Sequence, residues 1–199
     1  MRLLSIHDEM AVTLAVGYLL SGAVLLMPTE TVYGLMTLWN NQAGRKRIYA
    51  MKQRPEDKQL QMLAASLEQA AGCGLHVDMT LQKLAGAFWP GPLTMVCPAA
   101  EQQTIGLRIP ACDFLLSLLK RLEQPLAATS ANRSGLPPAV TLQDALQQLN
   151  GEPELALDAG EISQTDGVAS TVISLLGDEP QLLRAGPITE KQIQECLQK

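Results

Sequence analysis

The chain has 199 residues, 47% of them hydrophobic, which is enough for a single domain over residues 1–199 built around one substantial core. Aromatic side chains supply only 4%, so leucine, alanine, valine, isoleucine and methionine must fill that core. The formal net charge of −5 argues against a protein that coats nucleic acid or an anionic membrane by bulk attraction.

Helix-type and strand-type patterns alternate along the whole chain. In chain order they predict a helix at 7–21, strands at 23–26 and 35–39, a helix at 41–54, a strand at 60–64, a short helix after 66, a helix at 78–88, strands at 93–97 and 104–109, a helix at 114–122, a strand at 126–129, a helix at 141–149, strands at 154–157, 170–176 and 181–184, and a helix from 189. This interspersion predicts an α/β fold with a mixed sheet.

The first polar cluster lies in the stretch M-P-T-E-T-V-Y-G-L at 27–35. Pro28 cannot donate to a sheet ladder and so ends the preceding strand. Three polar side chains follow at 29–31, and Gly34 is expected to let the backbone turn into the next strand. Hydroxyls and a carboxylate at the mouth of a buried sheet are suited to orient a small polar ligand.

The second cluster is the basic motif K-Q-R-P at 52–55, with Lys58 close behind. Lys52 and Arg54 lie where a helix gives way to a loop, and two cations there suit a polyphosphate. The alternative is a solvated basic helix end, which the helix dipole favours.

Two further stretches place polar groups beside apolar strands. Arg108, in T-I-G-L-R-I-P at 104–110, needs an anionic partner, either a structural carboxylate or a substrate, and Gly106 beside it leaves room for a ligand. The loop T-S-A-N-R-S-G at 129–135 is either a set of ligand contacts or an ordinary polar turn. Ser170, which opens a later strand, completes the set.

Other chemistries find little support in the sequence. The four cysteines form no CxxC pair, which indicates free thiols in a reducing compartment, and we expect a cytoplasmic protein without a membrane segment. The only histidines, His7 and His76, fall in predicted loop or cap positions, so we expect neither a histidine triad nor a protein-bound metal. A phosphate-binding P-loop motif is absent.

Six ordered motifs nevertheless resemble one family. They are P-T-E-T-V-Y-G-L, K-Q-R-P-x-D-K, F-W-P-G-P-L-T, G-L-R-I-P, T-S-A-N-R-S-G and S-T-V-I, and the resemblance that they carry runs over about residues 8–186. Together they resemble the YrdC/TsaC family of threonylcarbamoyl-AMP synthases, in the short bacterial form without the C-terminal extension domain. The resemblance implies a twisted, open, mixed β-sheet with flanking helices (YrdC/RibB-like) and a concave basic cavity.

The resemblance also implies a reaction. L-threonine, bicarbonate and ATP, with Mg²⁺ as the companion of ATP, give L-threonylcarbamoyladenylate and pyrophosphate for the threonylcarbamoyladenosine modification of tRNA. The partners that the resemblance implies are tRNA itself and the proteins that transfer the threonylcarbamoyl group.

Site residues follow from the resemblance by position. The residues that match the threonine side are Thr31, Arg108, Ser130 and Ser170. The residues that match the ATP side are Arg54, Lys58, Thr104, Asn132 and Arg184. Lys52 and Arg54 are the catalytic candidates.

One departure keeps other activities open. Many longer members carry a histidine on the threonine side where this chain has Leu63. The alternatives are therefore a module of the same fold that binds RNA, or a paralogue with little synthase activity that acts on another amine or carbamoyl donor.

Overall fold

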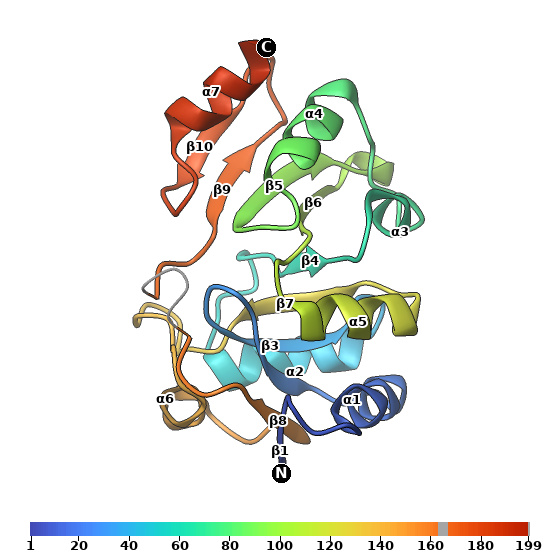
Figure 1. Cartoon of the computed structure of the whole chain (residues 1–199), viewed down its shortest axis with the longest axis vertical. Coiled ribbons are helices and arrows are strands. Elements are labelled where there is room, and N and C mark those ends of the chain that lie inside the picture. The colour runs from blue at the N-terminus through green and yellow to red at the C-terminus, as the bar shows by residue number, and fades with distance from the viewer. Residues whose placement is uncertain (163–166, 199) are drawn as a thin grey trace.

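The computed structural model describes residues 1–162 and 167–198, and it contains a ten-stranded mixed sheet (Figure 1). The strands are β1 (Arg2–Ser5), β2 (Leu25–Pro28), β3 (Tyr33–Leu38), β4 (Gln61–Leu63), β5 (Leu93–Pro98), β6 (Thr104–Arg108), β7 (Leu126–Ser130), β8 (Leu155–Asp158), β9 (Thr171–Ser174) and β10 (Gln181–Arg184). Their order across the sheet is β1-β8-β2-β3-β7-β4-β6-β5-β9-β10. Parallel and antiparallel pairs both occur, so the predicted mixed α/β sheet is confirmed.

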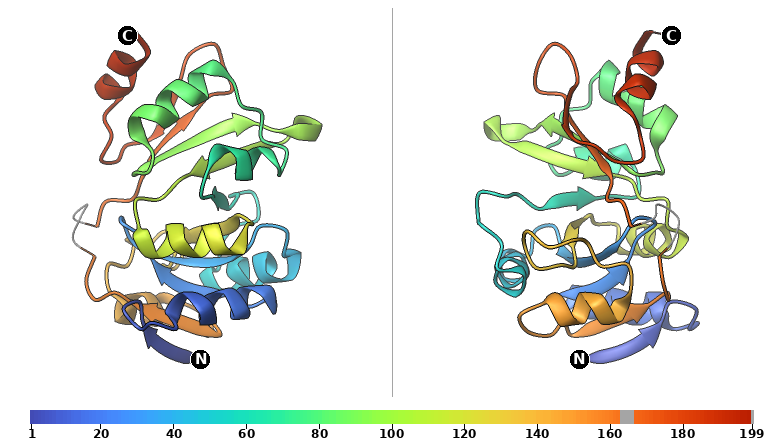
Figure 2. Two further views of the ribbon diagram at one scale, coloured as in Figure 1. Left: turned by 45° about the vertical axis from the view of Figure 1, so that its right-hand side comes forward. Right: turned by 90° about the vertical axis from the view of Figure 1, so that its left-hand side faces the viewer.

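Helices flank both faces of the sheet (Figures 1 and 2). They are α1 (Ala11–Leu20), α2 (Gln42–Lys52), α3 (Leu67–Ala71), α4 (Met79–Phe88), α5 (Asp113–Leu122), α6 (Leu142–Gln148) and α7 (Glu190–Gln198). In the half of the sheet near the N-terminus, α1 and α5 pack on one face and α2 and α6 on the other. In the other half, α3, α4 and α7 pack on a single face.

Side chains alternate between faces in the doubly covered half. Leu25 and Met27 belong to the core with α1 and α5, whereas Val24 and Leu26 belong to the core with α2 and α6. All four are fully buried. This is why an unbroken apolar run, and no polar alternation, marks the strand in the sequence.

The same alternation directs the side chains of β5 to two different faces. Leu93, Met95 and Cys97 point into the core beneath α4. Thr94 and Val96 therefore point to the opposite face, where they line a cavity. The half of the sheet with helices on a single face thus provides the wall of a binding site.

Several predicted helix starts are confirmed by their caps. The side chains of Asn41, Ser66, Asp78 and Thr141 each accept a hydrogen bond from a backbone N–H in the first turn of the following helix. Within the described part of the chain, no helix is long and apolar enough to span a membrane.

One helix boundary is predicted wrongly, and one strand is missed. The helix predicted from residue 7 begins at Ala11, because the hydroxyl of Ser5 and the carboxylate of Asp8 accept hydrogen bonds from His7 and Met10 and stabilise a turn before it. The residues before that turn form β1, which pairs in parallel with β8 and was not predicted.

Gly34 also has another role than the predicted one. It lies inside β3, paired with Met27 on one side and Ser130 on the other, and does not turn the chain. A Cβ atom there would lie 2.9 Å from the Met36 methyl group and 3.1 Å from the Thr129 carbonyl oxygen. The glycine therefore permits close packing of strands beside the cavity.

Candidate functional site

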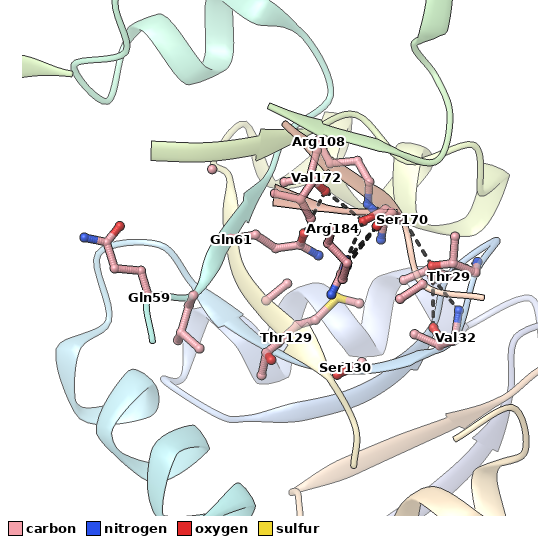
Figure 3. Close-up of a pocket in the computed structure, with 18 of the residues that line it drawn as sticks. Thr29, Val32, Gln59, Gln61, Arg108, Thr129, Ser130, Ser170, Val172 and Arg184 are labelled. Atoms are coloured by element: carbon pink, nitrogen blue, oxygen red, sulfur yellow. Dashed lines mark hydrogen bonds between the residues drawn. The ribbon is translucent and has the colours of Figure 1, made fainter. Parts of the chain in front are cut away.

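A cavity of about 260 Å³ lies on the sheet face opposite α4 and α7 (Figure 3). Its wall combines β3 to β7 and β9 with the 29–32 turn, the loop before β4 and Arg184 at the end of β10. Its polar lining residues are Thr29, Thr31, Arg54, Gln59, Gln61, Thr94, Arg108, Thr129, Ser130, Ser170 and Arg184. Segments that are far apart in the sequence therefore meet at one site.

Thr29 builds the turn between β2 and β3. Its hydroxyl oxygen accepts hydrogen bonds from the backbone N–H of Thr31 at 3.0 Å and of Val32 at 3.1 Å. The same hydroxyl donates to the Val32 carbonyl at 2.8 Å. This is a side-chain-stabilised turn, and it holds Thr31 in the cavity wall.

Glu30 and Arg108 form a buried ion pair. The Arg108 Nη1 atom lies 2.9 Å from Glu30 Oε1 and 3.1 Å from the Thr31 hydroxyl, and the two charged side chains are 2% and 3% exposed. Burial lowers the pKa of Arg108, and the Glu30 charge opposes this shift. Of the two partners that the sequence left open, the structure supplies the carboxylate, while Arg108 still lines the cavity.

This ion pair is incompletely hydrogen-bonded. Among the described residues, Glu30 Oε2 and Arg108 Nε have no partner. Buried charged groups are normally saturated with hydrogen bonds. Arg108 thus keeps hydrogen-bonding capacity beyond the contacts that hold it in place.

Lys52 is buried beneath the loop that follows β7. Its Nζ atom donates to the backbone oxygens of Ser130 and of Asn132, the latter at 2.7 Å, and lies 3.3 Å from Asn132 Oδ1. Burial, and then the nearby Arg54 charge, lower the pKa of Lys52 to about 7. The side chain is 1% exposed and does not line the cavity. In the structure, carbonyl oxygens of the protein thus offset the desolvation of Lys52.

Arg54 lines the cavity from the loop after α2. Its Nε and Nη2 atoms each donate at 2.9 Å, to the carbonyl oxygens of Lys58 and Gln59. Burial lowers the pKa of Arg54. Lys58, by contrast, has an exposed side chain outside the cavity lining, and its backbone positions the arginine.

Ser130 and Asn132 form the start of the polar loop. The Ser130 hydroxyl donates to Asn132 Oδ1, and Asn132 Nδ2 donates to the carbonyl oxygen of Leu136 at 2.6 Å. Ser130 lines the cavity, whereas Asn132 is buried just behind it. The loop is therefore a hydrogen-bonded support as well as part of the wall.

Arg184 and Ser170 close the other side of the cavity (Figure 3). The Arg184 guanidinium donates to the Ser170 carbonyl oxygen at 2.8 and 3.1 Å and to its hydroxyl at 3.1 Å. Burial, followed by the charges of Arg108 and Arg54, lowers the pKa of Arg184. Three guanidinium groups thus act on one another around the same small space.

The structure brings most of the predicted site residues together. Those that line the cavity are Thr31, Arg54, Arg108, Ser130, Ser170 and Arg184. Those outside its lining are Lys52, Lys58, Thr104 and Asn132. Of these four, Thr104 lines a neighbouring pocket that shares Gln59 and Leu60 with the cavity.

Sequence reasoning missed Gln61 and Thr94, which face the cavity from β4 and β5. The signal was present, because each is a polar residue at an alternating position in an apolar strand. Leu63, which stands where longer family members carry a histidine, is fully buried in the core and does not line the cavity.

Comparisons with known proteins agree on one family. A family model named Sua5_yciO_yrdC and described as "Telomere recombination" matches residues 17–186. A threonylcarbamoyl-AMP synthase from Pyrococcus abyssi is 35% identical over 199 residues, covering 96% of this chain and 58% of that protein. A putative threonylcarbamoyl-AMP synthase from Mycobacterium tuberculosis is 33% identical over 192 residues, covering 92% of this chain and 87% of that protein.

Coverage differs among these relatives. A Bacillus subtilis threonylcarbamoyl-AMP synthase is 34% identical over 193 residues, which are 92% of this chain but 55% of that protein. The chain therefore spans little more than half the length of the P. abyssi and B. subtilis proteins.

Solved structures show the same fold. The crystal structure of P. abyssi Sua5 complexed with L-threonine matches with a TM-score of 0.91 at 33% identity, covering 99% of this chain and 61% of that one. Escherichia coli YciO matches with a TM-score of 0.83 at 22% identity, covering 96% of this chain and 97% of that one.

Proposed function

The chain belongs to the Sua5/YciO/YrdC family, and we propose that it is a nucleotidyltransferase that makes L-threonylcarbamoyladenylate from L-threonine, bicarbonate and ATP. The observation that carries the proposal is the cavity, which gathers six of the ten predicted site residues. It is supported by the similarity to a Sua5 structure that contains L-threonine.

The proposed reaction depends on the alignment of its reactants more than on a general base. The threonine amine attacks the carbon of bicarbonate to give a carbamate and water. A carbamate oxygen then attacks the α-phosphorus of ATP, the bond to the β-phosphate oxygen breaks, and pyrophosphate leaves. Since the carbamate is already an anionic nucleophile, a cavity whose lining contains no histidine is suited to the step.

The cations around the cavity suit these anionic reactants. Arg54, Arg108 and Arg184 surround the space, and each has a pKa lowered by burial. Bound carboxylate and phosphate groups relieve this unfavourable proximity of like charges. We assign Thr31, Arg108, Ser130 and Ser170 to threonine.

For ATP we assign Arg54 and Arg184 to direct contact, with Lys58 and Thr104 toward its outer end. Lys52 and Asn132 are proposed to act through the loop that they hold, because both are buried outside the cavity lining. The described residues contain no group of three His, Cys, Asp or Glu suited to a metal. Because Mg²⁺ in such sites is held largely by substrate phosphates and water, we propose that Mg²⁺ arrives on the triphosphate oxygens of ATP.

Binding to RNA receives less support than catalysis. In the basic stretch 45–58, Arg47 pairs with Glu154 at 2.8 Å and Arg45 lies over the Trp39 ring at 4.7 Å. Lys52 is buried and Arg54 faces the cavity. These side chains are engaged within the protein, which leaves little of the stretch to track a phosphate backbone. We also propose that the product is passed to cytoplasmic proteins that modify tRNA.

The test is threonine-dependent release of pyrophosphate. The full chain, given ATP, Mg²⁺, bicarbonate and L-threonine, should release pyrophosphate and form the adenylate, and omission of threonine should abolish both. In parallel, ATP with threonine should raise the melting temperature. Stabilisation by RNA alone, without pyrophosphate release, would contradict the proposal.

A further inference from the structure

Gln61 is a polar residue in a strand whose other members are fully buried. β4 contains only Gln61, Met62 and Leu63, and the last two are 0% exposed. Gln61 lines the cavity, and its amide points from β4 toward Arg184 (Figure 3). A partly buried amide is unfavourable unless it is hydrogen-bonded, so its position calls for partners.

The strand register allows the amide to reach across the sheet. Met62 pairs with Leu107, so Gln61 lies beside Gly106 on β6. Gly106 in turn pairs with Val96 on β5. Because Gly106 has no side chain, nothing of it stands between Gln61 and the side chains of β5.

A chain of hydrogen bonds runs from Arg184 through Ser170 and Thr94 to the Gln61 amide. The Thr94 hydroxyl lies 3.1 Å from Gln61 Oε1 and 2.9 Å from the Ser170 hydroxyl, which accepts from Arg184 at 3.1 Å. An amide oxygen can only accept, so Thr94 donates to Gln61 and Ser170 donates to Thr94. The protons of both hydroxyls are thus used within the chain, and the Gln61 oxygen is turned toward Thr94.

The Gln61 amide nitrogen is left to face a ligand. Among the described residues its side chain makes only the hydrogen bond to Thr94, which uses the oxygen. Val96 and Val172 line the cavity with it. Two neutral N–H donors beside valine methyl groups match a substituent that carries both a hydroxyl oxygen and a methyl group.

We propose that Gln61 contacts the substrate and donates a hydrogen bond from Nε2 to the side-chain hydroxyl of L-threonine, so that the site selects threonine over valine. This inference rests on the proposed function, in which Arg108 contacts threonine, and it takes Arg108 as the partner of the threonine carboxylate. A guanidinium is the better partner for that charged group, which leaves the neutral amide for the neutral hydroxyl. A site that hydrogen-bonds a hydroxyl disfavours the isosteric methyl, because its donors would then stay unpaired.

Isothermal titration calorimetry on the full chain tests the inference with two amino-acid pairs. Wild type should bind threonine about tenfold more tightly than valine, and serine about tenfold more tightly than alanine. A factor of about ten in affinity is the usual net value of one hydrogen bond. Gln61→Met introduces a side chain of similar length without hydrogen-bond donors, and it should bring both affinity ratios to about one. Gln147→Met, the same change at an exposed glutamine on α6, should leave both ratios as in wild type.

Thr94→Val provides a second variant, because it removes the hydroxyl that holds the amide. It should lower both ratios part of the way toward one. If wild type binds threonine selectively and Gln61→Met keeps the ratios, the role of Gln61 is overturned while the proposed function stands. If Gln61→Met does not fold, unchanged ratios in Thr94→Val overturn the inference. If wild type binds no threonine, the proposed function itself is contradicted, and the inference about Gln61 falls with it.

Discussion

Glu30 holds Arg108 from the side away from the cavity: Arg108 lines the cavity and Glu30 does not, yet their charged atoms lie 2.9 Å apart. The carboxylate offsets the burial of the guanidinium without occupying the space for a ligand. A substrate carboxylate must therefore compete with Glu30 for the charge of Arg108, while it gains a guanidinium that is already oriented.

Replacing Glu30 should separate stability from binding. We expect Glu30→Gln to lower the free energy of unfolding by about 3 kcal/mol, because it leaves the buried Arg108 charge unpaired. L-threonine should then stabilise the variant more than it stabilises wild type, since its carboxylate replaces the lost charge. Urea unfolding with and without threonine measures both effects.

The matched control for Glu30→Gln is Glu195→Gln in the exposed pair with Lys191, which should change the free energy by less than about 1 kcal/mol. Equal stabilisation of Glu30→Gln and wild type by threonine would contradict the role of Glu30.

Lys52 should make stability depend on pH. Its pKa is about 7 in the folded protein against 10.5 in the unfolded chain, so the unfolded state binds more protons between these values. The free energy of unfolding of wild type, relative to Lys52→Met, should therefore rise from pH 7 to pH 10. Chemical unfolding at several pH values measures the difference. The control is Lys46→Met, which replaces an exposed lysine on the same helix. If the difference between wild type and Lys46→Met rose with pH as steeply as that for Lys52, this explanation would be contradicted.

Arg54 should be irreplaceable by lysine. Two of its nitrogen atoms hold the loop at Lys58 and Gln59 while the group lines the cavity, and an ammonium cannot reproduce that fork. We expect Arg54→Lys to lower the rate of pyrophosphate release roughly 100-fold. Arg121→Lys, a surface change on α5, should leave the rate unaltered. Near-normal turnover in Arg54→Lys would remove Arg54 from the phosphate site.

Gly34 should matter more for the ligand than for the fold. In Gly34→Ala the new methyl group meets the Met36 tip and the Thr129 carbonyl at the cavity wall. We expect the KM for threonine to rise by about tenfold or more, with a smaller change in melting temperature. Gly17→Ala, where a Cβ meets no atom within 4 Å, should stabilise α1 by about 0.5–1 kcal/mol and leave KM unchanged. If Gly34→Ala lowered the free energy of unfolding by more than it weakened the binding free energy of threonine, this assignment would be contradicted.

The sequence predicted elements whose signals are local. Helices capped by Asn41, Ser66, Asp78 and Thr141 begin where expected, since a cap and its first turn are only a few residues apart. β1 was missed because its partner, β8, lies more than a hundred residues away, and its own side chains are mostly exposed. Pairing of this kind leaves no pattern in four residues.

The site was predictable as a set of residues and less so as a set of contacts. The sequence indicated that Arg108 needs an anionic partner, and it indicated Lys52 as a contact for phosphate. The spacing of residues could not reveal that Glu30 neutralises one, or that backbone oxygens surround the other. Both depend on how distant strands and loops meet after folding.

The alternation along β5 has a consequence for protein engineering. Leu93, Met95 and Cys97 pack in the core with α4, while Thr94 and Val96 line the binding space on the opposite face. Substitutions at the second set can therefore be sampled in a combinatorial library without disturbing the first. The strand offers a route to variants that activate other amino acids, with the scaffold left intact.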